Sequence, residues 1–129
     1  MKFLLDTHTF LWWLDGDERL VKAARALIAD ESNTILVSAA SAWEISTKVR
    51  IGKLPGAKEV AADILRCIVT QGFETLSITV EHAQRAGLLG GSHRDPFDRM
   101  LIAQSQAENI PIVSNEDVFD SYGINRIWK

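Results

Sequence analysis

Residues 2–14 read KFLLDTHTFLWWL, and this stretch decides the fold class. A short apolar run over residues 2–6 predicts a buried strand, and the amphipathic run over residues 7–14 predicts a helix that follows it directly. The same alternation of short apolar and longer amphipathic runs continues along the chain. A parallel sheet with crossover helices requires such an alternation, so we expect an α/β protein.

The expected sheet has five short strands, each rich in Ile, Val, Leu or Phe, at residues 2–6, 34–38, 74–78, 110–114 and 124–127. The amphipathic stretches predict helices at about residues 7–14, 18–30, 40–52, 57–72, 80–89 and 96–109. Local signals agree with these limits, because Asp95 and Pro96 are typical of an N-cap and a first helical position. In an open parallel sheet, ligands bind at the edge where the strands lead into their helices.

The length of 129 residues and the hydrophobic content of 47% predict one globular domain spanning residues 1–129. Fourteen Lys and Arg against seventeen Asp and Glu give a net charge of −3, which excludes a polybasic arm and an acidic disordered tail. No apolar run approaches the ~20 residues that span a bilayer, and Asp6 ends the first run too early for a signal peptide. We therefore expect a cytoplasmic protein with no membrane segment. The single Cys67 cannot form an internal disulfide.

Two acidic residues mark the starts of expected helices. Asp6 closes the first strand and directly precedes a helix, where Asp is a preferred N-cap, so a structural role explains it when it is taken alone. Asp98 lies in the first turn of the helix at 96–109 and shares a face with Leu101 and Ile102, which is unusual for a surface acid. Asp98 is therefore either a residue that interacts with the helix dipole or a ligand.

Glu44 lies near the start of the helix that follows the second strand. Ser41 and Glu44 fit a capping box, and Lys48 stands one turn further on as an ion-pair partner. The apolar face of this helix lies away from Glu44, so the periodicity does not favour its burial. A functional role for Glu44 depends on where its helix starts, at the carboxyl edge of the sheet.

A fourth acidic position follows the strand that ends in Ser114. Glu116 and Asp117 both lie at this edge, and the sequence does not decide which of them faces the crevice. With the three acids above, they bring carboxylates from four chain regions to one edge of the sheet. Such carboxylates repel one another unless a cation is present, and an all-oxygen set favours Mg²⁺ or Mn²⁺ over zinc or copper. A divalent metal bound there can activate water for phosphodiester cleavage.

Basic residues accompany these acids in the sequence, at Lys48, Arg50 and Lys53 after Glu44, and at Arg94 and Arg99 around the segment 95–98. We expect Lys48, Arg94 and Arg99 to contact the phosphates of a polyanionic substrate. A solvated helix end explains residues 48–53 equally well. The three histidines lack zinc-site spacing and are interpreted as structural or surface residues.

Three blocks of the sequence resemble the PIN-domain ribonucleases, and among them the VapC toxins of bacterial toxin–antitoxin pairs. The first block is LLDTH at residues 4–8 with LWWL at 11–14, and the second is SAASAWEI at 38–45 with Lys48 and GKL at 52–54. The third block is HRDPFDRMLIAQ at residues 93–104. The blocks occur in the family's order and extend over nearly the whole chain.

The resemblance implies a PIN-like three-layer α/β/α sandwich with a mainly parallel sheet of about five strands. It also implies a site that binds Mg²⁺ or Mn²⁺ and hydrolyses RNA. By position, Asp6, Glu44 and Asp98 match the first three acids of the family. Glu116 stands where relatives commonly have the fourth acid, an Asp, and Asp117 is next to it. Ser114 matches the family's strand-end hydroxyl, which is expected to position a water or a carboxylate beside the substrate.

The resemblance further implies two protein partners, a cognate antitoxin that holds the enzyme inactive and a second copy of the chain in a homodimer. Trp12 and Trp13 bear on the second of these, although tryptophans on a helix most often indicate core packing. Adjacent residues of a helix cannot both face the same interior, so one of the two indoles is expected at a subunit contact.

The main alternative is a non-nuclease module, either a binding protein or a receiver-like phosphoacceptor that gathers acids and Mg²⁺ at the same edge of a five-stranded sheet. Such a receiver resembles a pattern with an acidic pair after the first strand. Here Asp6 is followed by Thr7, so this part of the pattern is missing.

Overall fold

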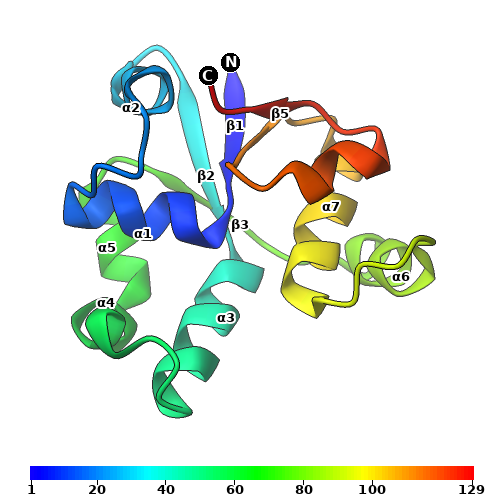
Figure 1. Ribbon diagram of the computed structural model, residues 1–129, viewed down its shortest axis with the longest axis horizontal. Helices are drawn as coiled ribbons and strands as arrows, with labels where there is room; N and C mark the ends of the chain where they lie inside the picture. Colours follow the sequence, from blue (N-terminus) through cyan, green and yellow to red (C-terminus); the bar gives the residue numbers. More distant parts are fainter.

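The computed structural model describes residues 1–129, and Figure 1 shows the arrangement of its helices and strands. The strands are β1 (Lys2–Leu5), β2 (Thr34–Ser38), β3 (Glu74–Leu76), β4 (Ile112–Val113) and β5 (Arg126–Ile127). The α-helices are α1 (Thr7–Asp15), α2 (Lys22–Ala29), α3 (Ala39–Arg50), α4 (Lys58–Ala62), α5 (Ile64–Thr70), α6 (Val80–Leu88) and α7 (Pro96–Glu108). The 3₁₀ helices are η1 (Pro55–Ala57) and η2 (Asp117–Tyr122). None of the helices combines the length and the apolar character that a membrane crossing requires.

The five strands are all parallel and lie in the order β3-β2-β1-β4-β5. β1 is central, because its residues pair with β2 on one side and with β4 on the other. The chain builds one half of the sheet from β1 to β3 and then crosses over to build the other half. The crevice where the winding reverses therefore lies beyond the carboxyl ends of β1 and β4. A receiver-type sheet has the order 2-1-3-4-5, so this topology differs from that of the alternative.

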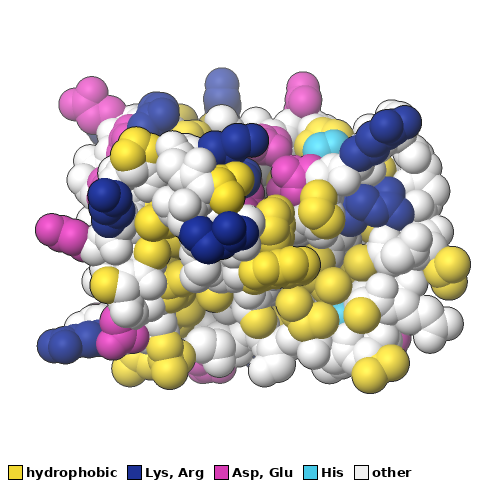
Figure 2. All heavy atoms as spheres, turned by 90° about the horizontal axis from the view of Figure 1, so that it is seen from below, with side chains coloured by type: hydrophobic (Ala, Val, Ile, Leu, Met, Phe, Trp, Pro, Cys, Tyr) yellow, Lys and Arg dark blue, Asp and Glu magenta, His cyan; other side chains and the backbone are white.

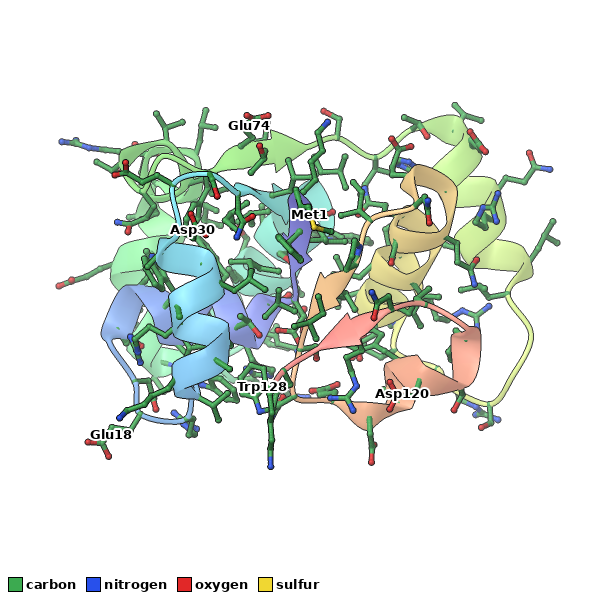
Figure 3. All side chains as sticks on the ribbon, turned by 90° about the horizontal axis from the view of Figure 1, so that it is seen from above. Met1, Glu18, Asp30, Glu74, Asp120 and Trp128 are labelled. Atoms are coloured by element: carbon green, nitrogen blue, oxygen red, sulfur yellow. The ribbon has the colours of Figure 1, made fainter.

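Alternating residues of the central strands produce the layers of the sandwich. Phe3 and Leu5 of β1 belong to an apolar cluster that includes residues of α1, α2 and α5, whereas Leu4 packs with residues of α7 on the opposite face. Figure 3 shows the sheet extending from Glu74 in β3 to the end near Trp128, with α1 and α2 on one side and α6 and α7 on the other. The prediction of a three-layer α/β/α sandwich with a five-stranded parallel sheet is confirmed.

Two of the expected helices are shorter than the sequence pattern suggests. The helix predicted from residue 18 begins only at Lys22, because the preceding residues form a turn in which the Leu20 amide donates to the Asp17 carbonyl at 3.1 Å. The helix predicted over residues 57–72 is divided in two. Asp63 interrupts it, and the Asp63 side chain accepts a hydrogen bond from the Arg66 amide and so caps α5.

Candidate active site

Asp6 follows β1 and is the N-cap of α1, as its structural interpretation predicts. Its Oδ1 accepts a hydrogen bond from the Thr9 amide at 2.8 Å, and its Oδ2 accepts one from the Ser114 hydroxyl at 2.5 Å. Burial raises the pKa of Asp6, although the hydrogen bonds from Ser114 and Thr9 act in the opposite direction. A cap needs only one carboxylate oxygen, so capping alone does not account for a buried carboxylate that is also bonded to the end of β4.

Ser114 lies directly after β4 and connects two of the acidic positions. Its buried hydroxyl donates to Asp6 and accepts a hydrogen bond from the Glu116 amide at 3.0 Å. Ser114 was expected to position either a water or a carboxylate beside the substrate, and its contacts match the positioning of a carboxylate. The hydroxyl is engaged on both sides, so direct contact with a substrate is not the role that the structure favours.

Glu44 of α3 is buried, which corrects the expectation drawn from the helix periodicity. Its Oε1 accepts a hydrogen bond from the Thr7 hydroxyl at 2.6 Å, and its Oε2 pairs with the Lys48 ammonium group at 2.5 Å. The predicted capping box is also wrong, because Ser38 is the N-cap of α3 and the Ser41 hydroxyl lies 3.0 Å from that of Thr7. Polar partners therefore make the burial of Glu44 acceptable.

Asp98 lies in the first turn of α7, and Asp95 is the N-cap of this helix as predicted. Nε2 of His93 lies 2.9 Å from Oδ2 of Asp98. Burial raises the pKa of Asp98 to about 7, although the hydrogen bond with His93 lowers it. The negative charges of Asp95, Glu116 and Glu44 add to the rise. Asp98 thus experiences the other acids of the site at close range, as a member of a carboxylate cluster would.

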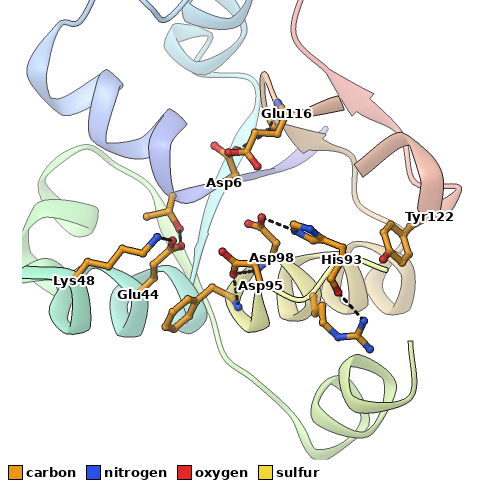
Figure 4. A network of polar contacts seen from close by, with 12 residues as sticks. Asp6, Glu44, Lys48, His93, Asp95, Asp98, Glu116 and Tyr122 are labelled. Atoms are coloured by element: carbon orange, nitrogen blue, oxygen red, sulfur yellow. Dashed lines mark hydrogen bonds and ion pairs between the residues drawn. The ribbon is translucent and has the colours of Figure 1, made fainter. Parts of the chain in front are cut away.

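The two candidates for the fourth acid occupy different surroundings. Glu116 is half-buried, and its pKa is raised by burial and by the charge of Asp6. Asp117 is exposed, and its negative charge favours the charged form of Arg126 instead. Figure 4 shows Glu116 beside Asp6, which makes Glu116 the member of the pair that faces the acidic space.

The different surroundings of these two acids lead to a direct comparison of Glu116→Gln with Asp117→Asn. We expect Glu116→Gln to lower the metal-dependent RNA cleavage that the family resemblance implies by about 10- to 100-fold, because a charged group that faces the site is removed. Asp117→Asn is expected to leave the rate unchanged. Initial rates on one RNA at saturating Mg²⁺ measure the difference, and the reverse ranking would assign the fourth acid to Asp117.

Figure 4 shows the four carboxylates facing a common space at the carboxyl edge of the sheet: Asp6, Glu44, Asp98 and Glu116. As these side chains stand, no three His, Cys, Asp or Glu residues are grouped closely enough to hold a metal ion. Three of the carboxylates instead contact polar groups of the protein: Asp6 contacts Ser114, Glu44 contacts Lys48, and Asp98 contacts His93. The donor set nevertheless fits Mg²⁺ or Mn²⁺, because it contains only oxygen and because, in addition to burial, the charges of the other acids raise the pKa values of Asp98 and Glu116.

Arg99 was expected to contact phosphate, but the structure does not place its guanidinium group at the site. Its guanidinium group donates to the backbone carbonyls of Ala86 at 2.9 Å, Leu89 at 2.5 Å and His93 at 3.1 Å. These contacts hold the loop between α6 and α7, which corrects the expectation that Arg99 is free to contact phosphate. Arg94 is exposed and remains available for that role.

Arg99→Met is expected to lower the free energy of unfolding by about 2 kcal/mol, because the loop carbonyls lose a charged hydrogen-bond donor while the apolar stem is retained. Urea denaturation measures the change, and proteolysis is expected to cut more readily within residues 89–94. Arg94→Met is the matched control and should be neutral within about 0.5 kcal/mol. Equal stability of the two variants would contradict the assignment of Arg99 to the loop.

Two residues of the site were not singled out from the sequence, Thr7 and His93. Thr7 directly follows Asp6, and its hydroxyl reaches Glu44 across a separation of 37 residues. His93 lies five residues before Asp98, and its contact with that residue differs from the purely structural role expected for the histidines. His82 does have such a role, because it is buried and its Nδ1 accepts a hydrogen bond from the Thr79 amide at 3.1 Å.

The two adjacent tryptophans are both half-buried within one molecule, so neither requires a subunit contact. The ring of Trp12 lies 6.1 Å from that of Trp128, and the ring of Trp13 lies 5.9 Å from that of Phe73. The exposed tryptophan is Trp43, a residue that is 60% exposed. The premise from helix geometry is therefore wrong, because both indoles pack against the same apolar cluster. The expected subunit contact stays a prediction.

The fold agrees with the comparisons with known proteins. The PIN-domain family profile matches residues 3–125, and the chain belongs to this family. Over 66 residues the chain is 42% identical to the protein named Ribonuclease VapC16 of Mycobacterium tuberculosis. The aligned region covers 51% of this chain and 45% of that relative, so the match spans about half of each.

Solved structures with the same fold cover essentially the whole chain. VapBC2 from Rickettsia felis, bound to a promoter DNA fragment, superimposes with a TM-score of 0.73 at 19% identity and full coverage of both chains. VapC20 of Mycobacterium tuberculosis, described as a sarcin-ricin loop cleaving toxin, gives 0.71 at 16% identity, with 98% of this chain and 99% of that chain covered. DNA-bound VapBC from Salmonella typhimurium gives 0.70 at 18% identity, with coverages of 100% and 99%. These similarities confirm the fold.

Proposed function

We propose that this protein is a metal-dependent ribonuclease and the toxin component of a toxin–antitoxin pair. The observation that carries the proposal is the convergence on one space of carboxylates from the residue after β1, from α3 and α7, and from the segment after β4. Membership of the PIN-domain family and the relative named as a ribonuclease support the reaction class. The mutual repulsion of these acids supports Mg²⁺ or Mn²⁺ as the cofactor.

The residues of this chain position the reacting groups. Asp6, Asp98 and Glu116 would hold the ion, which supplies an activated water and stabilises charge on the phosphoryl group when it is bound. Ser114 fixes the orientation of Asp6, and His93 fixes that of Asp98. Such polar partners keep carboxylates in place before the substrate arrives, which lowers the reorganisation that the reaction requires.

Glu44 has a different environment from the other three acids, because a lysine ammonium group, that of Lys48, already balances its charge within the protein. We assign Glu44 to the orientation of the attacking water and Lys48 to a phosphate beside it. Arg94, which is exposed and lies four residues before Asp98 in the chain, is the second phosphate contact. Figure 2 shows Lys and Arg side chains near Asp and Glu side chains on one face of the molecule, which suits a polyanionic strand.

The proposed partners follow from the same assignment. The structural neighbours include toxin–antitoxin complexes, which supports a cognate antitoxin that covers the acidic edge. The proposal includes a cytoplasmic location, because the RNA substrate and the antitoxin are found in the cytoplasm. It also includes a homodimer, as the family resemblance implies. Co-purification of a neighbouring small protein from the native operon tests the antitoxin, and an active protein without any such binder would count against it.

Cleavage of defined RNAs tests the central claim. The protein is incubated with Mg²⁺, Mn²⁺ or chelator, and the products are mapped to the nucleotide. We expect discrete cuts that require the metal, disappear with chelator and return when metal is added in excess. Cleavage that is indifferent to chelator, or no cleavage with either metal, would overturn the proposal.

A further inference from the structure

A pocket of about 230 Å³ lies between α1, η1 and the start of α4. Leu11, Trp12 and Leu54 contribute apolar surface to it, and Arg19 and Lys53 contribute positive charge. We call this feature the Trp12 pocket. It is separate from the acidic space, and none of the roles assigned above uses it.

The Trp12 indole gives this pocket a flat aromatic surface. The Arg19 guanidinium lies over the Trp12 ring, 5.0 Å from its centroid. Arg19 is otherwise held only by an ion pair with Asp17, and its side chain is 70% exposed. Exposed ion pairs contribute little to stability, so Arg19 can move aside or stack on an incoming ring at small cost. Aromatic rings and guanidinium planes are the groups on which proteins stack unpaired nucleobases.

The charges around the pocket suit an anionic strand that continues toward the acidic site. Lys53 is exposed and makes no ion pair, so it is available for a phosphate. His8 lines the pocket, and its charge lowers the pKa of both Asp6 and Glu116 against the larger effect of burial. His8 therefore lies close to both features. Asp15 is the only acid that lines the pocket, and it acts on Arg19.

We propose that the Trp12 pocket binds one nucleobase of a single-stranded RNA, next to the phosphate that is cut at the acidic site. The inference rests on the proposed ribonuclease function and adds a base-binding subsite to it. The base stacks on Trp12 and Arg19, and Lys53 contacts a neighbouring phosphate. The volume suits a single flat ring, and the two cations beside an acidic site match RNA better than a neutral apolar peptide.

The test measures RNA affinity in the Asp98→Asn background, so that cleavage does not consume the probe. The probe is a fluorescein-labelled ten-nucleotide RNA that spans the mapped cut, and one base at a time is replaced by an abasic site. We expect loss of one particular base beside the cut to weaken binding about 5- to 100-fold. In Trp12→Leu the intact RNA should bind more weakly by a similar factor, and removal of that base should have no further effect.

Trp13→Leu is the matched control, because Trp13 is also half-buried but donates through its indole to Gln71 and packs against Phe73. It should retain the sensitivity to the abasic site. If Trp12→Leu does not fold, Lys53→Gln and Arg19→Gln replace it, with Arg50→Gln as the exposed control outside the pocket. The lysine and arginine changes should each lower RNA affinity, and the control should not.

The outcomes separate this inference from the proposed function. If the wild-type protein cleaves RNA with metal, but the pocket variants and the abasic series leave affinity unchanged, the subsite is refuted and the ribonuclease stands. If the wild-type protein does not cleave RNA, the proposed function itself fails. If Trp12→Leu weakens binding of the antitoxin and not of RNA, the pocket is a protein-docking surface and the inference is wrong.

Discussion

Asp6→Asn and Asp98→Asn are each expected to lower metal-dependent RNA cleavage by on the order of 10³-fold, the loss typical of removing one charge-stabilising group from a preorganised site. Each change keeps the volume of the side chain and removes one negative charge from the space in which four carboxylates meet. The measurement is the initial rate on one defined RNA at saturating Mg²⁺, repeated with Mn²⁺. Full activity in both variants would refute the assignment of these acids.

Urea unfolding is the second readout, and it distinguishes a loss of activity in Asp6→Asn from a folding defect. Asn is as good an N-cap as Asp, so the new amide oxygen can still accept the hydrogen bond from the Thr9 amide. Burial already opposes the charge of Asp6, so without metal the variant should unfold at the same urea concentration as the wild type or a higher one. Asp30→Asn, at an exposed helix end, is the control and should change neither quantity.

The sheet could be predicted from the sequence because its signals are local. Leu4 and Leu5 belong to a continuous apolar run that ends at an acid, and such a run indicates a strand buried on both faces. Asp95 and Pro96 mark the start of α7 through preferences that involve only neighbouring residues. The position of the acidic edge follows from the same signals, since every parallel strand delivers its carboxyl end to one side of the sheet.

The burial of Glu44 could not be predicted, because its cause is distant in the sequence. A helical wheel shows Glu44 on the polar side of α3, and on an isolated helix that side faces water. In the folded chain α1 packs against this side and brings the Thr7 hydroxyl to the carboxylate. The spacing of residues within α3 contains no information about α1, so only the tertiary structure reveals the pair.

Arg99 illustrates the opposite error, in which a charged residue beside an acidic motif is assigned to the substrate. Its position next to Asp98 suggested a phosphate contact. In the structure its guanidinium instead satisfies carbonyls at the end of α6 and in the loop that follows. Backbone carbonyls that lack partners at the end of a helix are not visible in a sequence, yet they attract a nearby Arg as a phosphate does.

Lys48→Met is expected to lower the free energy of unfolding by about 3 kcal/mol in the absence of metal. The reason is that Glu44, whose side chain is only 5% exposed, loses the ammonium group that balances its charge. Met retains the apolar stem of Lys48, so lost packing contributes little. Urea denaturation in the presence of chelator measures the effect. Lys58→Met, at an exposed position in α4, is the control and should be neutral within about 0.5 kcal/mol.

The double variant Glu44→Gln/Lys48→Met identifies the origin of that loss. If the unbalanced charge of Glu44 is responsible, replacing both partners should recover most of the stability, because no buried charge then remains. Added Mg²⁺ or Mn²⁺ should also stabilise Lys48→Met more than the double variant, since only in the single variant does the cation replace the ammonium group that balanced the charge of Glu44. If Lys48→Met is instead as stable as the wild type but binds RNA more weakly, the ammonium group serves the substrate and its pairing with Glu44 is incidental.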